Sequence, residues 1–251
     1  MPKLIILGSS NAIPSETHEN THMALVGREH ALLVDCATNP IVRLERAGLD
    51  PLNLPDIILT HFHPDHVSGL PLLLMDMWLM GRRLPLNIYA LDHTVDRVQN
   101  LMEAYSWSSW PDFYPVAFHR IPEQEKAAVL EHQEWRVFSS PVRHLIPAIG
   151  LRVEFPQTNK VLAYSCDTEP CPQMVRLAQG VDVLIHESTG NSTGHSSPAQ
   201  AGSIASQARA KSLYLIHYPN RDIDPQSFVA EAKKSYAGDV ELATDFMNLD
   251  F

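Results

Sequence analysis

Three histidines and one aspartate lie within six residues of one another, in the segment His61-Phe62-His63-Pro64-Asp65-His66. Imidazole and carboxylate ligands together suit zinc, iron or manganese, and a site built from them needs no cysteine. Because Pro64 cannot continue a strand or a helix interior, we expect a turn there that lets the side chains diverge to two centres. The spacing therefore predicts two divalent metal ions, zinc first and manganese or iron as alternatives. A chance histidine-rich loop is the competing interpretation.

This histidine segment directly follows an apolar stretch, Asp56–Thr60, that is typical of a short buried strand. Loops that leave a strand end often carry functional residues, because the sheet holds them in a rigid frame. After the segment, Val67–Met80 is compatible with a helix despite Pro71.

Further strands and helices are predicted in both halves of the chain. The strands are expected at Leu4–Leu7, Met23–Val26, Ala31–Val34, Leu86–Ala90, Trp135–Ser139, Ile149–Phe155, Val161–Tyr164, Val181–Ile185, Leu213–Ile216 and Val240–Leu242. The helices are expected at Pro40–Ala47, Thr94–Tyr105, Pro198–Ala210 and Pro225–Ser235. Strands in runs, with helices interspersed in each half, indicate sheets packed on each other with helices outside, rather than one doubly wound sheet.

Length and charge limit the possible classes of protein. With 251 residues and 45% hydrophobic content, the chain can form one large sandwich or two small domains. It shows no repeat and no obvious linker, so a single domain over residues 1–251 is expected. The formal charge of −10 repels polyanions, so a nucleic-acid partner would need a local basic patch or bound metal. Strong long-range binding of nucleic acid is not expected.

Three cysteines, Cys36, Cys166 and Cys171, make no disulfide framework, and their odd number indicates a reducing compartment. The first residues are too short for a signal segment and are typical of a strand. The longest apolar stretch, Leu70–Met80, is interrupted by Asp76 and is too short to span a membrane. A cytoplasmic protein without a membrane partner is therefore expected.

The pattern H-x-H-x-D-H after a short apolar strand resembles the metallo-β-lactamase superfamily. Three later residues stand where that family has its remaining ligands, namely His144, Asp167 and His217. The resemblance implies that one metal is bound by His61, His63 and His144. It implies that the other is bound by Asp65, His66 and His217, with Asp167 as the bridge. It also implies an α/β (α+β) fold, the αββα sandwich of two mixed β-sheets with helices on the outer faces.

A mechanism follows from such a metal pair. Water or hydroxide that bridges two cations has its pKa lowered to about 7 at a good zinc site. It can then attack a carbonyl carbon or a phosphorus while the cations stabilise the oxyanion. Asp65 is expected to accept a proton or to orient this nucleophile.

Four further segments resemble ribonuclease Z-type proteins, namely Leu7–Ser15, Leu33–Cys36, His186–Thr189 and Gly194–Gly202. The resemblance implies that His195 protonates a leaving oxygen and that Glu187 orients it. The residues around His195 are also typical of a helix start capped by serine, and both interpretations can hold together.

The chain departs from the ribonuclease Z pattern in three places. The expected strands Leu151–Phe155 and Val161–Tyr164 are joined by only five residues, so there is no room for the arm that clamps transfer RNA. Cys166 replaces the usual glycine before the bridging aspartate, and Glu169 stands where a basic residue is common. The Cys166 thiol could reach the metals or could be a buried packing group.

Aromatic residues are concentrated between Tyr105 and Phe118, where they could pack beneath a loop or form a lid over an apolar or base-like substrate group. Arg82, Arg83 and Arg143 are basic candidates for holding an anion. A solvated surface is the alternative for the Arg82–Arg83 pair.

The first hypothesis is a dinuclear metal phosphodiesterase that acts on a small phosphodiester, a cyclic nucleotide or a short nucleic acid. A second is a hydrolase of carboxylic or sulfuric esters, or of lactones, on the same metals. A transfer-RNA 3′-processing endoribonuclease and a non-catalytic sensor or scaffold are further alternatives. The complete ligand set with His195 and Glu187 argues against the sensor. The resemblance also makes a homodimer an expectation.

Overall fold

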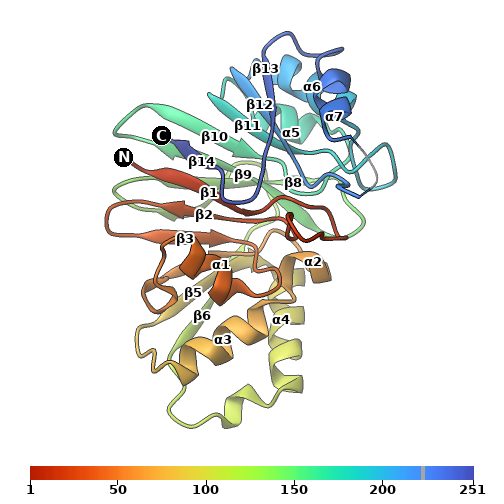
Figure 1. Cartoon of the computed structure of the whole chain (residues 1–251). Coiled ribbons are helices and arrows are strands. Elements are labelled where there is room, and N and C mark those ends of the chain that lie inside the picture. Colours follow the sequence, from red (N-terminus) through yellow and green to blue (C-terminus); the bar gives the residue numbers. More distant parts are fainter. Residues whose placement is uncertain (222–223) are drawn as a thin grey trace.

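In the computed structural model of the chain, which describes residues 1–221 and 224–251, apolar strands from both halves of the sequence form two seven-stranded sheets that face each other (Figure 1). The first sheet has the order β14-β1-β2-β3-β4-β5-β6 and the second the order β13-β12-β11-β10-β9-β8-β7. Each sheet has an antiparallel part and a parallel part: β3 to β6 are parallel in the first, and β10 to β13 in the second. The expected sandwich of two mixed sheets is confirmed.

The strands of the first sheet are β1 (Lys3–Gly8), β2 (His22–Val26), β3 (Ala31–Val34), β4 (Asp56–Ile58), β5 (Leu86–Leu91), β6 (Val116–Ile121) and β14 (Asn248–Asp250). Those of the second are β7 (Ala127–Glu131), β8 (Arg136–Val142), β9 (Ala148–Phe155), β10 (Lys160–Tyr164), β11 (Val183–Glu187), β12 (Ser212–Ile216) and β13 (Asp239–Leu242). The helices are α1 (Pro40–Arg46), α2 (Pro64–Val67), α3 (Leu70–Leu79), α4 (Asp92–Ala104), α5 (Pro172–Leu177), α6 (Pro198–Ala208) and α7 (Gln226–Ala232). Short 3-10 turns occur at Pro51–Asn53 and Trp107–Ser109.

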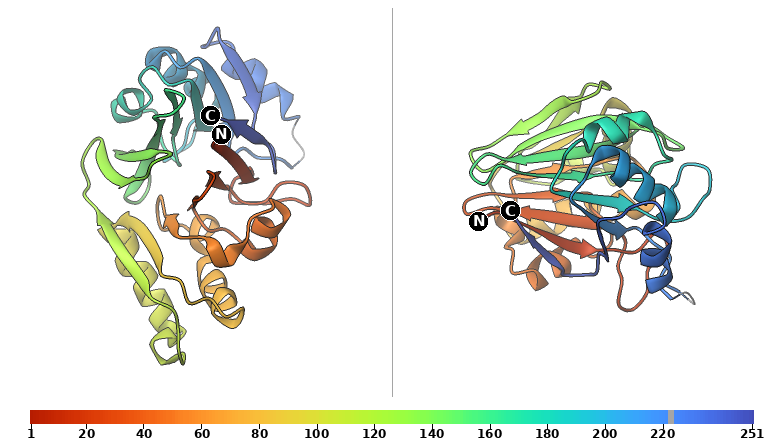
Figure 2. Two further views of the ribbon diagram at one scale, coloured as in Figure 1. Left: turned by 90° about the vertical axis from the view of Figure 1, so that its left-hand side faces the viewer. Right: turned by 90° about the horizontal axis from the view of Figure 1, so that it is seen from above.

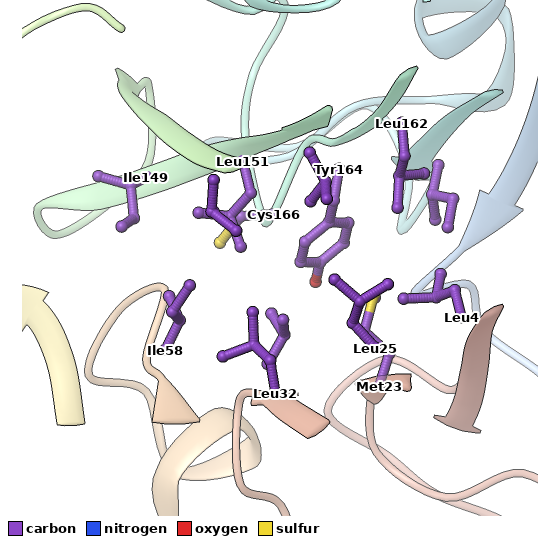
Figure 3. Packing of buried hydrophobic residues seen from close by; sticks show 14 of the residues in the cluster. Leu4, Met23, Leu25, Leu32, Ile58, Ile149, Leu151, Leu162, Tyr164 and Cys166 are labelled. Carbon is purple, nitrogen blue, oxygen red and sulfur yellow. The ribbon is translucent and has the colours of Figure 1, made fainter. Parts of the chain in front are cut away.

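Alternation along the strands places apolar side chains on both faces of each sheet. Leu4 and Ile6 of β1 point into the core between the sheets, whereas Ile5 and Leu7 belong to the cluster on the outer face. Figure 3 shows the inner core, where Leu32 and Ile58 of the first sheet lie opposite Leu151 and other residues of the second. Sheets that are apolar on both faces need cover on both, which the helices provide.

Helices cover both outer faces, as the views in Figure 2 show. Residues of α1, α3 and α4 pack on the first sheet, and residues of α5, α6 and α7 on the second. The layers are therefore helix, sheet, sheet, helix. None of the described helices is both long and apolar enough to cross a membrane.

The expected helix over Val67–Met80 and the expected turn at Pro64 are both corrected by the structure. Pro64 begins the short helix α2, and α3 begins separately at Leu70. Proline is favoured in a first helical turn, because its missing N–H is not needed there. The break falls at Gly69, where a Cβ atom would lie 1.7 Å from the carbonyl oxygen of Ala37. Only glycine lets the two segments approach this closely.

Candidate metal centre

His195 lies in the loop between β11 and α6. The other predicted site residues lie at the carboxyl end of a strand or in the segment that directly follows it. These strands are β4, β8, β10, β11 and β12. Since β8 is antiparallel to β9, and β9 is antiparallel to β10, β8 runs in the same direction as β10. Ligands in α/β folds bind at the carboxyl ends of parallel strands, where the loops converge. Both sheets therefore contribute to one site.

Three imidazole nitrogen atoms converge in the first group of residues. His63 Nδ1 lies 3.1 Å from His61 Nε2 and 3.0 Å from His144 Nε2. Nitrogen atoms that share a tetrahedral zinc ion at about 2.0–2.1 Å lie roughly 3.3 Å apart, close to these separations. Burial lowers the pKa of all three imidazoles, well below the usual value for His61. The rings are thus kept neutral, as metal ligation requires.

The second group contains two imidazoles and two carboxylates. Asp65 Oδ2 lies 3.5 Å from His66 Nε2 and 3.3 Å from His217 Nε2. Two buried atoms here, His66 Nε2 and Asp167 Oδ1, have no hydrogen-bond partner. Buried polar atoms without a partner are rare because they are costly, and a bound cation would satisfy both. The donor set therefore fits a divalent metal ion.

Asp167 stands between the two groups. Its Oδ2 atom lies 3.5 Å from both His66 Nε2 and His217 Nε2, and 3.9 Å from His61 Nε2 of the first group. Burial opposes its ionisation, but the charges of His217 and His66 hold the pKa of the Asp167 carboxyl well below its ordinary value. Burial likewise opposes ionisation of Asp65, but His217 and His66 lower its pKa to about 2. Both carboxylates are available as ligands at neutral pH.

Asp35 supports one imidazole from each group. It accepts hydrogen bonds from the Thr60 N–H (2.7 Å) and the Thr60 Oγ1–H (2.8 Å), and from His66 Nδ1–H (2.9 Å). Thr60 Oγ1 in turn accepts from His61 Nδ1–H at 3.1 Å. These bonds fix the ring orientation and leave Nε2 of both histidines free for a metal. No role for Asp35 is predicted from the sequence, although an acidic residue directly after the apolar strand Ala31–Val34 is an available signal.

His144 and His217 are held in the same way by groups in the loop that follows β11. The backbone oxygen of Gly194 accepts from His144 Nδ1–H at 2.7 Å. Thr189 Oγ1 donates to the His217 carbonyl oxygen and accepts from His217 Nδ1–H, each at 2.8 Å. Neither partner was predicted, because each depends on how loops pack rather than on a local pattern.

His195 lies beside the candidate metal ligands and is backed by a carboxylate. Its ring centroid is 5.1 Å from that of His144 and 5.9 Å from that of His217. The fully buried Glu187 accepts from His195 Nδ1–H at 3.2 Å, and its two oxygens also accept three backbone N–H groups. Burial works against charge on His195, but Glu187 raises the pKa of the ring above its usual value. The Nδ1 contact with Glu187 leaves Nε2 of His195 free to face a substrate, and the raised pKa favours the protonated ring.

The segment after His195 also forms the expected capped helix start. Ser197 caps α6, with its hydroxyl accepting from the Gln200 N–H and the Gln200 side chain accepting from the Ser197 N–H. The capping interpretation is confirmed, and it coexists with the placement of His195.

Two of the three departures from the ribonuclease Z pattern, Cys166 and Glu169, have structural explanations. Cys166 has a positive φ of 56°, the conformation that favours glycine at this position. Its buried Sγ lies 3.4 Å from His61 Nδ1, the ring nitrogen that does not contact His63, so the thiol packs behind a candidate ligand. Glu169 Oε1 accepts from the N–H of Gly194 at 2.9 Å and so holds the loop that carries His195.

The aromatic segment and Arg82 do not contribute to the site, whereas Arg143 lies beside it. The aromatic segment packs at the far end of α4, away from α2 (Figure 1), with Trp110 stacked on Trp78 at 5.2 Å. It is not a lid over the metal centre. Arg82 is buried and donates to backbone oxygens, Leu52 among them, so it is not an anion-binding group. Arg143 is exposed and lines a hollow of about 430 Å³ beside His144.

Residues 30–218 match the family described as Beta-lactamase superfamily domain. Among curated relatives, a Ribonuclease Z of Methanothermobacter thermautotrophicus is 26% identical over 305 aligned positions that cover 100% of this chain and 97% of the relative. A Ribonuclease BN of Cronobacter sakazakii is 28% identical over 309 positions that cover 98% of this chain and 99% of the relative. Both alignments are longer than the 251 residues of this chain, so both relatives contain segments that it lacks.

Several solved structures have a similar fold. The metallo-beta-lactamase fold protein YhfI from Bacillus subtilis has a TM-score of 0.84 at 21% identity, covering 99% of this chain and 98% of that chain. The short form of human tRNase Z has a TM-score of 0.79 at 24% identity, with the same coverage. A diphosphatase from the PhnP family has a TM-score of 0.75 at 20% identity, covering 100% of this chain and 98% of that chain. At these identities the three structures show the fold alone.

Proposed function

The chain belongs to the β-lactamase superfamily, and from that premise we propose that it is a dinuclear metal phosphodiesterase. It is a metal-dependent hydrolase of ester bonds; the proposal concerns the bond and the size of the substrate. We assign it small phosphodiesters, cyclic nucleotides or short nucleic acids. The observation that carries the assignment is His195, held by the buried Glu187 beside both groups of candidate ligands. Alkoxide leaving groups of phosphodiesters require such a proton donor.

The metal assignment uses seven residues. His61, His63 and His144 would hold one cation, and Asp65, His66 and His217 the other, with Asp167 between them. Bound there, two divalent ions, zinc first, would lower the pKa of water and polarise the phosphoryl oxygens. Because both sheets contribute ligands, we propose that residues 1–251 act as one catalytic domain.

Protein side chains orient the attacking water and supply a proton to the leaving group. The pKa of the Asp65 carboxyl is lowered to about 2, so the group is ionised at neutral pH and can orient the attacking water. His195 Nε2 donates a proton to the departing oxygen on the opposite side of phosphorus. Glu187 is a positioning residue, because it holds His195 through Nδ1 and does not face the substrate.

Two features favour a small substrate. Strands β9 and β10 are joined by a tight hairpin, with only residues 156–159 between them, so no arm projects from this place. The net charge of −10 gives no long-range attraction for RNA. Both argue against transfer-RNA maturation for this chain, even though curated relatives are named Ribonuclease Z and Ribonuclease BN. The hollow beside His144, with Arg143 in its lining, is large enough for the remote part of a small anionic substrate.

A hydrolysis panel tests the choice of bond. We expect protein loaded with zinc or manganese to hydrolyse bis(p-nitrophenyl) phosphate at least about tenfold faster than p-nitrophenyl acetate, aryl sulfates or lactones, measured as kcat/KM. A phosphodiester is negatively charged and is attracted to a site that holds two cations, whereas carboxylic esters and lactones are neutral. Faster turnover of lactones or carboxylic esters would instead establish the competing hydrolase activity.

A further inference from the structure

A second hollow, of about 420 Å³, is lined by residues between Glu103 and Val116. This segment lies at the end of α4 that is far from α2 (Figure 1). The residues that line the hollow include the aromatic residues Trp107, Trp110 and Phe113 and the acidic residues Glu103 and Asp112. Among the described residues that line this hollow, none is a candidate metal ligand. The proposed phosphodiesterase activity leaves this cluster without a role.

The Phe113 ring lies edge-on to the rings of both Trp107 and Trp110. The Phe113 ring lies 5.8 Å from Trp107 at an interplanar angle of 66°, and 5.3 Å from Trp110 at 83°. Trp110 is stacked on Trp78, whose Nε1–H donates to the Pro111 carbonyl oxygen at 2.9 Å. The walls are therefore held in place before any ligand arrives, which reduces the entropy cost of binding.

The charge of the hollow favours a cation. Glu103 accepts from the Nε1–H of Trp107 and from the hydroxyl of Ser108, which keeps its carboxylate beside the ring. Asp112 is exposed, and the described lining contains no lysine or arginine. The faces of indole and phenyl rings carry negative potential and attract cations. The carboxylates and the aromatic rings therefore both attract a cation.

We propose that this hollow binds an alkylated ammonium group, such as the trimethylammonium head of choline. Crossed aromatic rings with nearby carboxylates suit such a group, because its methyl groups bury well against rings and need no hydrogen-bond acceptor. A primary ammonium is more strongly hydrated and loses more on entering an apolar wall. The site is independent of the metal chemistry.

Calorimetric titration of the full-length, metal-loaded protein with choline tests the proposal. We expect a Kd on the order of 1 mM. The neutral isostere 3,3-dimethylbutan-1-ol should bind at least about tenfold more weakly, because it has the shape of choline without the charge. Equal binding of the two molecules, or no binding of choline in this range, would overturn the proposal.

Two variants locate the binding. Trp110→Ala should weaken choline binding by about tenfold. Asp112→Asn should weaken it by roughly threefold. Asn tolerates the left-handed φ of 53° at position 112, so this second variant keeps the fold even where the loss of Trp110 disturbs it. The matched control is Asp92→Asn, an exposed carboxylate at the start of α4. Wild-type choline affinity in both Trp110→Ala and Asp112→Asn would place the ligand elsewhere.

Discussion

Replacing Asp167 by asparagine is expected to abolish phosphodiester hydrolysis and to remove metal from the protein. The Asp167 carboxylate is the only negative group that lies between the two sets of candidate ligands among the described residues, within 3.9 Å of an imidazole in each. Metal polarisation contributes several kcal/mol to such reactions, so we expect kcat to fall by a factor of about 10³ or more. Elemental analysis should find at most one metal ion per chain in the variant.

Asp182→Asn is the matched control for that experiment. Asp182 directly precedes β11 of the second sheet. It therefore lies at the amino ends of the parallel strands, whereas the candidate site lies at their carboxyl ends. It accepts from the Val161 N–H and from Lys211. The control should keep its metal and its activity. Full metal content and near-normal turnover in Asp167→Asn would remove the bridging role from Asp167.

His195→Ala is expected to slow substrates according to their leaving group. Nucleoside and alkyl phosphodiesters release a strongly basic oxygen, which needs a proton as the bond breaks, so their kcat should fall by about 10²–10⁴-fold. Nitrophenolate leaves without a proton, and p-nitrophenyl phosphodiesters should lose far less. The measurement is a comparison of kcat for both substrate types in the same metal-loaded preparation.

Two further variants separate proton donation from general disturbance of the site. Glu187→Gln should show the same dependence on the leaving group, with a smaller loss of kcat. The neutral amide stabilises the protonated form of His195 less well than the carboxylate does. His119→Ala, at an exposed histidine on β6, should have no effect. If His195→Ala slows good and poor leaving groups equally, His195 is not the general acid.

Much of the candidate site could be predicted because its residues form a contiguous segment or end a strand. His61, His63, Asp65 and His66 follow β4 directly, so spacing alone indicated a metal site. His144, Asp167 and His217 were placed by resemblance, and they meet because the carboxyl ends of parallel strands in both sheets share one edge. Their metal ligation itself stays a prediction.

The supporting groups could not be predicted, because their contacts depend on long-range register. Asp35 reaches His66 only through the pairing of β3 with β4, in which the Asp35 N–H donates to the Ile58 carbonyl oxygen. Thr189 reaches His217 through the pairing of β11 with β12. Neither contact leaves a pattern within one segment of sequence.

The missed elements were also weak in local pattern. β14 is three residues long and mostly exposed, and its pairing with β1 stabilises it more than its own composition does. β6 and β7, near the sheet edge, are half exposed, so they lack the apolar run of a buried strand. The short helix α5 begins at Pro172, between two segments already assigned as strands.

The proposed site holds two metal ions that support phosphodiester hydrolysis. Metal-free protein titrated with zinc or manganese, while hydrolysis of bis(p-nitrophenyl) phosphate is followed, tests it most directly. We predict that activity rises until two equivalents of metal per chain have been added and is then constant, because two groups of ligands must be filled. A plateau at one equivalent, or full activity before any metal is added, would contradict the account.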